Sequence, residues 1–376
     1  MYKNLKIGVL GGGQLGRMMI QSSLDFNLDI RIMDPDPAAP CQQIASKFVA
    51  GSITEKESVL SFGRECDIIT IEIENVNTEA LKILAAEGKK VYPQPEIIEM
   101  IQDKSRQKLF YQEHGFPTSE FVLTKDRAEL DQHVSFLPAV HKLAREGYDG
   151  RGVQKIFSTE DLQKGFDAPG VLEKFVDFEK EIAVITARTP SGKVTSFPVV
   201  ELAFHPEKNL VEYLFSPADL PSHIVEKASK LAVDLTEKLG IAGLLAVEMF
   251  VTKSGEILIN EIAPRPHNSG HHTIEANATS QFEQHLRAIL DLPLGDTKAY
   301  ASAAMVNLLG EDGYTGDAIY QGVEELLALE DVHIHLYGKK ITKPFRKMGH
   351  VTLVDQDVNR LKQKAEMVKQ TLKIIA

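Results

Sequence analysis

A strand that runs directly into a glycine-rich turn and then a helix constrains the fold of this chain more than any other feature. Leu5 to Leu10 is an apolar run typical of a buried strand, Gly11 to Gly16 contains four glycines, and Leu15 to Phe26 has a helical pattern. A second apolar run, Leu28 to Met33, follows at once. A helix between two successive strands places them in parallel, so the pattern predicts a parallel sheet covered by helices on both faces.

This alternation continues to residues 91–95, where two prolines interrupt it. The next segment has a different pattern: a helix from Glu96 to His114, then strands that pair across short turns. Two hairpins and a long helix are expected there, at Glu181 to Val200, Leu244 to Ile262 and Pro221 to Leu239. We therefore predict an α/β domain over residues 1–95, an α+β domain over 96–294 and a small third domain over 295–376.

Composition limits the classes of function. The 376 residues carry a formal net charge of −11, which disfavours general nucleic-acid binding because that needs a large basic surface. No apolar stretch is long enough to span a bilayer. The two cysteines, Cys41 and Cys66, form no CxxC motif, and the N-terminus leads straight into a strand without a visible signal peptide. A cytoplasmic protein is expected.

The N-terminal turn matches the dinucleotide-binding fingerprint. Gly11, Gly13 and Gly16 have the GxGxxG spacing after a strand, and Asp34 follows about 20 residues later at the end of the second strand. Taken alone, this pattern indicates an NAD oxidoreductase. Two other interpretations stay open at this point: glycines that allow tight packing, or a turn that binds a different polar ligand.

A second glycine-rich segment suits a nucleoside triphosphate. It runs from Lys142 to Gly152 and contains three glycines within six residues, with a lysine ahead of them. Glycines let backbone N–H groups approach phosphate oxygens, and basic side chains supply charge. The alternatives are a surface hairpin loop and a flexible cap over phosphates.

Two glutamates are placed for a metal ion. Glu248 and Glu261 lie in strongly apolar strands, and a two-residue turn at Ser254-Gly255 would put them directly opposite each other. Facing like charges are destabilising unless something neutralises them, and a Mg²⁺ ion shared with a substrate phosphate is a common solution. A shared proton or a solvated edge pair are the alternatives.

Dense polar residues follow Glu261, and here the chain resembles the ATP-grasp superfamily and, within it, the N5-carboxyaminoimidazole ribonucleotide synthetase family. Five segments in the same order carry the resemblance, namely residues 13–18, 72–76, 147–152, 260–271 and 346–350. The resemblance implies an ATP-grasp fold of three domains: an N-terminal Rossmann-like (pre-ATP-grasp) domain without NAD, a central ATP-grasp domain and a small C-terminal domain. It also implies ATP-dependent carboxylation of 5-aminoimidazole ribonucleotide with bicarbonate, through carboxyphosphate, in purine biosynthesis.

The resemblance further implies a role for particular residues. Lys104 and Lys142 would contact the ATP phosphates, Glu181 the ribose, and Asn260 the nucleotide, while Glu248 and Glu261 would hold Mg²⁺ (or Mn²⁺). The phosphate-covering loop would be Gly147, Tyr148, Asp149, Gly150, Arg151, Gly152 and Val153, and the adenine segment Glu173, Lys174, Phe175 and Val176. The acceptor and bicarbonate would be surrounded by Gln14, Leu15, Glu74, Tyr148, Asp149, Arg151, Arg265 and His267. Simpler roles remain for some of these, such as an exposed helical lysine for Lys104, a packing aromatic for Tyr148 and a structural hydrogen bond for His267.

A basic cluster near the C-terminus suits the 5′-phosphate of the ribonucleotide. Lys339, Arg346 and Lys347 fall within nine residues of an otherwise acidic chain, and arginine can grip a phosphate bidentately. We expect Lys339 and Arg346 to bind it, with Lys347 as the alternative, because Phe345 stands where the family often has glycine. Glu72 is interpreted as a solvated strand residue.

Three rival functions stay open. The first is another ATP-grasp ligase, such as formate-dependent glycinamide ribonucleotide transformylase. The second is an NAD oxidoreductase built on the first glycine turn, and the third is a nucleotide-binding protein without turnover. The family resemblance also implies a homodimer.

Overall fold

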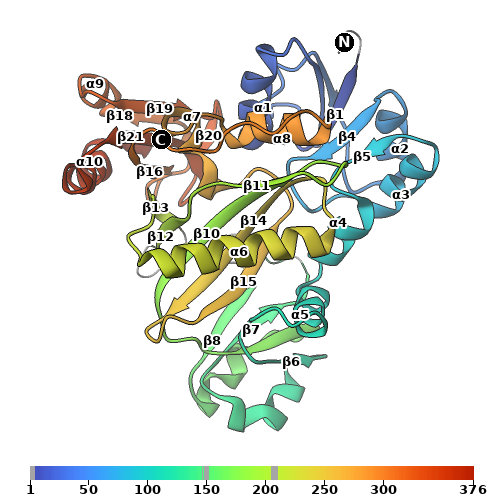
Figure 1. The fold of residues 1–376 in the computed structure, drawn as a ribbon, viewed down its shortest axis with the longest axis vertical. Coiled ribbons are helices and arrows are strands. Elements are labelled where there is room, and N and C mark those ends of the chain that lie inside the picture. Colours follow the sequence, from blue (N-terminus) through green and yellow to red (C-terminus); the bar gives the residue numbers. More distant parts are fainter. Residues whose placement is uncertain (1–4, 146, 148–151, 205–210) are drawn as a thin grey trace.

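The computed structural model describes residues 5–145, 147, 152–204 and 211–376 of the chain. Three larger sheets organise it (Figure 1). A parallel sheet and the C-terminal part lie at one end of the molecule, and a small sheet lies at the other. Among the described residues, no helix combines the length and apolarity needed to cross a membrane.

The N-terminal sheet is parallel, as the strand–helix alternation predicts. Its strand order is β3-β2-β1-β4-β5, and helices α1, α2 and α3 connect the strands. The bounds are β1 Lys6–Leu10, α1 Gln14–Leu24, β2 Asp29–Asp34, β3 Lys47–Ala50, α2 Lys56–Arg64, β4 Ile68–Ile71, α3 Thr78–Ala86 and β5 Lys90–Val91. One covering helix comes from far along the chain: Phe282, Leu286 and Ile289 of α8 (Gln281–Ile289) pack into the same core as β1 and α1.

A small antiparallel sheet follows two short helices. The strand order is β6-β9-β7-β8, and two 3-10 helices lie in its connections. The bounds are α4 Pro95–Ile101, α5 Lys104–Glu113, β6 Phe121–Thr124, η1 Ala128–Phe136, β7 Ala139–Leu143, β8 Val153–Ile156, η2 Thr159–Lys164 and β9 Gly170–Lys174.

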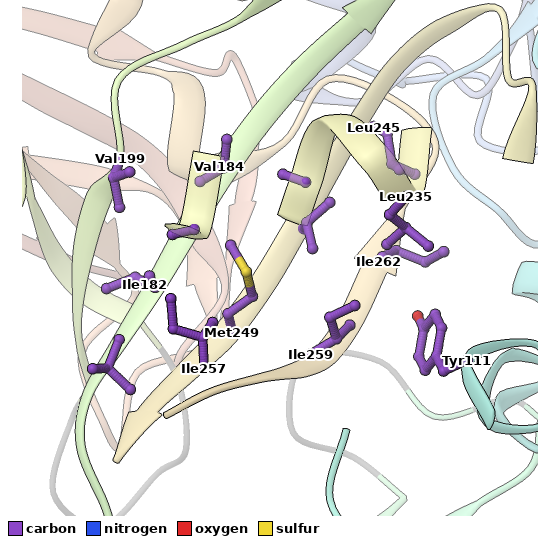
Figure 2. Packing of buried hydrophobic residues seen from close by; sticks show 14 of the residues in the cluster. Tyr111, Ile182, Val184, Val199, Leu235, Leu245, Met249, Ile257, Ile259 and Ile262 are labelled. Atoms are coloured by element: carbon purple, nitrogen blue, oxygen red, sulfur yellow. The ribbon is translucent and has the colours of Figure 1, made fainter. Parts of the chain in front are cut away.

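The large sheet is antiparallel and runs through the rest of the chain in the order β15-β14-β10-β12-β13-β16-β21-β19, with β11 beside β10. Helix α6 (Ser222–Leu239) ends at the predicted residue and packs across β10, β14 and β15, and Gly240 closes its C-terminus in the left-handed conformation. Figure 2 shows the apolar side chains between α6 and these strands. The strand bounds are β10 Phe178–Arg188, β11 Val194–Ser196, β12 Val200–Phe204, β13 Val211–Ser216, β14 Gly243–Thr252, β15 Ile257–Ala263, β16 Ser302–Leu309, β19 Val332–Leu336 and β21 Lys347–Asp355.

Short helices and strand pairs follow β15 and surround the C-terminal strands of the large sheet. After β15 come η3 Asn268–Gly270 and α7 Thr273–Ala276, which lead into α8. The C-terminal part adds two short strand pairs and two helices, namely β17 Gly316–Asp317 with β20 Ile341–Thr342, β18 Ile319–Gln321 with β22 Lys373–Ile375, α9 Val323–Leu327 and α10 Val358–Thr371. Helix α10 packs on β16 and β21 in a separate apolar core.

Candidate active site

A break between helices α4 and α5 places Lys104 in contact with the large sheet. The single helix predicted for Glu96 to His114 is wrong: α4 ends at Ile101 and α5 begins at Lys104. Asp103 caps α5 because its side chain accepts the backbone N–H groups of Ser105 (3.0 Å) and Arg106 (3.4 Å). Lys104 therefore occupies the first turn of a new helix, and its Nζ donates to Oε2 of Glu261 at 3.2 Å.

A β-bulge places two consecutive polar residues on the same face of β15. Met249 pairs with Ile259, but Glu248 pairs with Glu261, so Asn260 is an extra residue in its strand. Ile259 and Ile262 point into the apolar core beneath α6. Asn260 and Glu261 consequently both face the opposite side, toward the small sheet.

The predicted pairing of Glu248 with Glu261 is confirmed, but the turn that was expected to produce it is wrong. Val251 pairs with Ile257, and the backbone N–H of Thr252 donates to the carbonyl of Glu256, so the turn is longer than two residues. The bulge at Asn260 then shifts the register by one. Without this bulge the longer turn would not put the two glutamates opposite each other.

Three carboxyl groups converge beside the bulge. Burial, together with the neighbouring Glu261 and Glu181, raises the pKa of Glu248 well above its ordinary value. Burial and Glu261 raise the pKa of Glu181 to about 8, and its Oε1 accepts a hydrogen bond from Asn260 Nδ2 at 3.4 Å. Glu261 differs because the Lys104 ammonium lowers its pKa to about 2.

These residues fit a divalent cation that also binds a phosphate. Glu248 is a buried carboxyl that faces other carboxyls, and a cation would stabilise its ionised form. Among the described residues, no group of three or more His, Cys, Asp or Glu side chains is arranged to enclose a metal ion by itself. A Mg²⁺ ion bound with a nucleotide needs only one or two carboxylates, because phosphate oxygens and waters complete its coordination.

A second lysine reaches the same place from the small sheet. Lys142 on β7 donates to Asn260 Oδ1 at 2.9 Å and lies 3.0 Å from Glu173 Oε1. Glu173, expected in the adenine segment, has its side chain turned toward Lys142 and Lys108, and it pairs with β6 and β7 on either side of β9. Lys174 donates to the carbonyl of Phe136 at 3.0 Å. Phe175 and Val176 are half-buried.

The phosphate-covering loop is described only at its ends. Tyr148, Asp149, Gly150 and Arg151 lie outside the described residues. Gly147 and Gly152 lie close together, because a Cβ atom on Gly152 would be 3.0 Å from the Cα atom of Gly147. The backbone N–H of Leu143 donates to the carbonyl of Gly152 at 2.9 Å, and Val153 begins β8, so the base of the loop is a closed hairpin beside Lys142.

The first glycine turn is filled by the protein's own carboxylates. Gly12 N–H donates to Asp34 Oδ2 at 2.6 Å, and Leu15 N–H donates to Glu72 Oε1 at 3.1 Å. A Cβ atom on Gly13 would lie 2.6 Å from Glu72 Oε1. The interpretation of Glu72 as a solvated residue is wrong: it is buried, and burial raises its pKa to about 7. These carboxylates take the donors and the space that a dinucleotide pyrophosphate would need.

Two residues expected around the acceptor link the large sheet to the N-terminal parallel sheet. Arg265 Nε lies 2.7 Å from Glu74 Oε1, which links the end of β15 to the loop after β4. His267 Nε2 lies 3.5 Å from Glu248 Oε1, and its Nδ1 is 2.9 Å from Ser269 Oγ. Gln14 is half-buried at the start of α1. The Leu15 side chain packs in the apolar core, and its backbone N–H already donates to Glu72.

The C-terminal basic residues contact different parts of the protein. Lys339 Nζ donates to the carbonyl of Lys347 at 2.7 Å. The positive charge of Lys339 lowers the pKa of Glu72, but the effect of burial on that pKa is larger. Lys347 acts in the same way on Glu248. Arg346 donates to the carbonyl of Ile341 at 2.5 Å. Phe345 has φ +61°, a conformation that suits glycine, so the backbone keeps a glycine-like turn despite the phenylalanine.

Sequence reasoning missed two buried charged residues at this site, Glu72 and Lys108. Lys108 Nζ lies 2.8 Å from Glu173 Oε2, and the lysine is 2% exposed. Its position four residues after Lys104 on one helical face was the available signal, because residues so spaced lie side by side on a helix.

Family models match the chain in three consecutive segments. A ribonucleotide synthetase preATP-grasp domain matches residues 4–102, an ATP-grasp domain 109–282, and a phosphoribosylaminoimidazole carboxylase C-terminal domain 303–364. N5-carboxyaminoimidazole ribonucleotide synthase from Bacillus subtilis is 37% identical over 362 residues, which cover 94% of this chain and 93% of that protein.

Solved structures agree over the whole chain. N5-carboxyaminoimidazole ribonucleotide synthetase from Thermotoga maritima matches with a TM-score of 0.90 and 42% identity over 99% of each chain. N5-carboxyaminoimidazole synthase from Aspergillus clavatus, in complex with ADP and 5-aminoimidazole ribonucleotide, matches with a TM-score of 0.88 and 33% identity over 98% of this chain and 99% of that one.

Proposed function

The chain belongs to the N5-carboxyaminoimidazole ribonucleotide synthase family of ATP-grasp ligases, and from this premise we propose how its residues carry out the reaction. The enzyme converts 5-aminoimidazole ribonucleotide, bicarbonate and ATP into N5-carboxyaminoimidazole ribonucleotide, ADP and phosphate, a step of purine biosynthesis. The observation that carries the site proposal is the convergence of Lys104, Lys142, Asn260, Glu248 and Glu261 at one β-bulge.

The chemistry of the reaction explains why the site at the bulge needs cations. Bicarbonate is a poor electrophile because hydroxide is a poor leaving group. Transfer of the γ-phosphoryl group to a bicarbonate oxygen gives carboxyphosphate and ADP, and phosphate then leaves the carboxyl carbon easily. The exocyclic amine of the ribonucleotide attacks that carbon, or the CO₂ released from it, and loses a proton. Lys104 and Lys142 orient the triphosphate and stabilise its developing charge.

Glu248 and Glu261 would hold Mg²⁺, or Mn²⁺ in its place. When bound, such an ion supplies Lewis-acid stabilisation of the phosphoryl oxygens. Lys104 is then shared between Glu261 and the phosphates, and Glu181 accepts the ribose hydroxyls. The loop from Gly147 to Val153 excludes water, which matters because carboxyphosphate hydrolyses readily.

The acceptor lies where the three parts of the chain meet. Arg265 holds bicarbonate or carboxyphosphate bidentately, a contact for which guanidinium geometry is suited. Gln14, Glu74 and His267 surround the imidazole and ribose, together with Tyr148, Asp149 and Arg151. Lys339 and Arg346 bind the 5′-phosphate, with Lys347 as the alternative. The division into residues 1–95, 96–294 and 295–376 belongs to this proposal.

The test is ATP hydrolysis measured with each substrate omitted in turn. We expect phosphate release to require both bicarbonate and 5-aminoimidazole ribonucleotide, and ¹⁸O from labelled bicarbonate to appear in the released phosphate. Formate serves as the control for the related transformylase activity and should support no turnover. Phosphate that carries no ¹⁸O would contradict the carboxyphosphate route.

We also propose that the enzyme is a cytoplasmic homodimer. Both cysteines are buried and unpaired with each other, as suits a reducing compartment. Sedimentation equilibrium measures the assembly directly, and a monomer at micromolar concentration would contradict the dimer.

A further inference from the structure

A buried cluster of three charged residues, Lys108, Glu173 and Lys142, adjoins the proposed phosphate site. Glu173 on β9 divides its two carboxylate oxygens between two lysines: Oε1 lies 3.0 Å from Lys142 Nζ, and Oε2 lies 2.8 Å from Lys108 Nζ. Glu173 and Lys108 are 4% and 2% exposed. Lys142 also donates to Asn260 of the large sheet, whereas Lys108 contacts Thr118 and Ser119.

Lys108 has no donor left for a substrate. An ammonium group has three N–H donors. Those of Lys108 face Thr118 Oγ1 at 2.7 Å, Ser119 Oγ at 3.1 Å and the Glu173 carboxylate at 2.8 Å. Any effect of Lys108 on the reaction must therefore pass through the residues that it holds.

The cluster carries a net positive charge. Although burial raises the pKa of Glu173, Lys142 and Lys108 outweigh it and bring that pKa to about 2. Burial lowers the pKa of Lys108 to about 8, and the neighbouring lysines contribute in the same direction. One carboxylate thus lies between two lysine side chains, so the charge of Glu173 is divided between Lys108 and Lys142.

The same contacts tie the two sheets together. Ser119 donates to Glu173 Oε2 at 2.7 Å, and Thr118 donates to the carbonyl of Ile259 at 2.7 Å, directly before the bulge at Asn260. Lys108 on α5 consequently links the small sheet, which carries Lys142, to the strand that carries Asn260 and Glu261.

We propose that Lys108 is a positioning residue, which occupies one oxygen of Glu173 so that the other holds the Lys142 ammonium at the phosphate site without neutralising it. The inference rests on the proposed contact between Lys142 and the ATP phosphates. Removal of Lys108 leaves Glu173 and Lys142 as a closed one-to-one pair, and Lys142 then binds a phosphate less well. When the charge of Glu173 is removed together with Lys108, Lys142 is no longer neutralised and binds the phosphate again.

Steady-state kinetics of Lys108→Met and of Lys108→Met/Glu173→Gln test this sequence of effects. We expect Lys108→Met to raise KM for ATP roughly 10-fold, within the range of coupling in buried charge networks. KM for the ribonucleotide should change less than about twofold, because well-separated sites behave independently. The double variant should recover much of the ATP affinity, which loss of structure alone would not produce.

Two further variants keep the result decisive. Lys82→Met removes a half-buried ion pair with Glu99 (2.8 Å) outside the proposed site and should leave both KM values unchanged. If Lys108→Met folds poorly, Ser119→Ala removes one donor to the same Glu173 oxygen and should raise KM for ATP about two- to threefold, the effect of one modest hydrogen bond.

The outcomes separate this inference from the proposed function. If Lys142→Met weakens ATP binding but neither Lys108→Met nor Ser119→Ala does, the role of Lys108 is wrong and the phosphate site stands. A failure of the double variant to recover ATP affinity would also contradict the role of Lys108. If Lys142→Met leaves KM for ATP unchanged, the phosphate site itself is wrong.

Discussion

The two glycine-rich segments of this chain look alike in sequence and differ in how their charges are matched. At the first turn, Asp34 and Glu72 accept the N–H groups of Gly12 and Leu15, so the anion in the turn is already part of the protein. At the second, the base of the loop lies beside Lys142, and Lys104 and Lys142 meet Glu261 and Glu173. A glycine-rich turn can bind phosphate only where its donors are left for a ligand, and at the first turn the N–H groups of Gly12 and Leu15 are already taken by the protein.

The largest expected effect comes from the carboxylates of the second region. Glu261→Gln should reduce turnover at least roughly 100-fold, because it removes a main electrostatic stabiliser of the transferring phosphoryl group. The fold should survive, since the amide can still meet Lys104. The measurement is kcat at limiting and at saturating Mg²⁺. Turnover near the wild-type rate at limiting Mg²⁺ would remove Glu261 from the metal site.

Arg346→Ala should weaken the ribonucleotide specifically. Loss of a charged hydrogen bond costs about 1.5–3 kcal/mol, a rise of roughly 10- to 150-fold in KM for 5-aminoimidazole ribonucleotide. KM for ATP should hardly change, because Lys104 and Lys142 lie in another part of the chain. Steady-state kinetics with each substrate varied in turn provide the check.

Lys347→Ala is the matched comparison for Arg346→Ala. The two residues are adjacent at the start of β21, and the charge of Lys347 reaches Glu248. A large ribonucleotide effect in Lys347→Ala with none in Arg346→Ala would move the phosphate contact by one residue. No effect in either variant would contradict a phosphate site in this cluster.

The buried carboxyl of the first turn should make stability depend on pH. Burial raises the pKa of Glu72 from 4.5 to about 7, so the folded protein binds this proton more tightly than the unfolded chain does. The resulting stabilisation is present below about pH 4.5 and is lost as pH rises through about 7. Its size is at most about 3.5 kcal/mol, since one pKa unit corresponds to about 1.4 kcal/mol.

Glu72→Gln isolates this contribution because the amide oxygen can still accept the Leu15 N–H. Thermal unfolding of both proteins between pH 5 and pH 8 should show the variant gaining stability relative to the wild type as pH rises. Parallel pH profiles would mean that Glu72 keeps an ordinary pKa.

The smallest expected effect is no effect at all. NAD and NADP should show no saturable binding at millimolar concentration, because Asp34 and Glu72 occupy the donors and the space of the first turn. Calorimetric titration of the wild type, with ATP as the positive control, is the measurement. Saturable binding of either dinucleotide would overturn the difference between the two regions.

The sequence predicted those features that follow from local pattern. The alternation of strands with helices located the parallel sheet, short turns between strands located the hairpins, and the predicted end of α6 at Leu239 is correct. The opposed glutamates were predicted from an assumed turn, yet the bulge at Asn260 produces them. A bulge depends on how two strands fit against the core, which no short stretch of sequence specifies.

Features that depend on tertiary contacts were missed. Asp103 reads as an ordinary helical residue until its capping bonds are seen. From the sequence Glu72 is expected to be exposed at a strand end. It is buried because the glycines of the first turn have no side chains and allow its carboxyl group to pack against them. Lys108 looks like a surface lysine, and only its fold-dependent partners explain why a charged residue is almost inaccessible to solvent.

The central claim is that ATP phosphates and a divalent cation bind at the bulge between Glu248 and Glu261 and not at the first glycine turn. Anomalous diffraction from Mn²⁺, in crystals grown with a non-hydrolysable ATP analogue, locates both directly. We predict a manganese peak in contact with both glutamates, with the triphosphate beside Lys104 and Lys142. A triphosphate lying against Gly11 to Gly16, or a manganese peak away from both glutamates, would contradict the account.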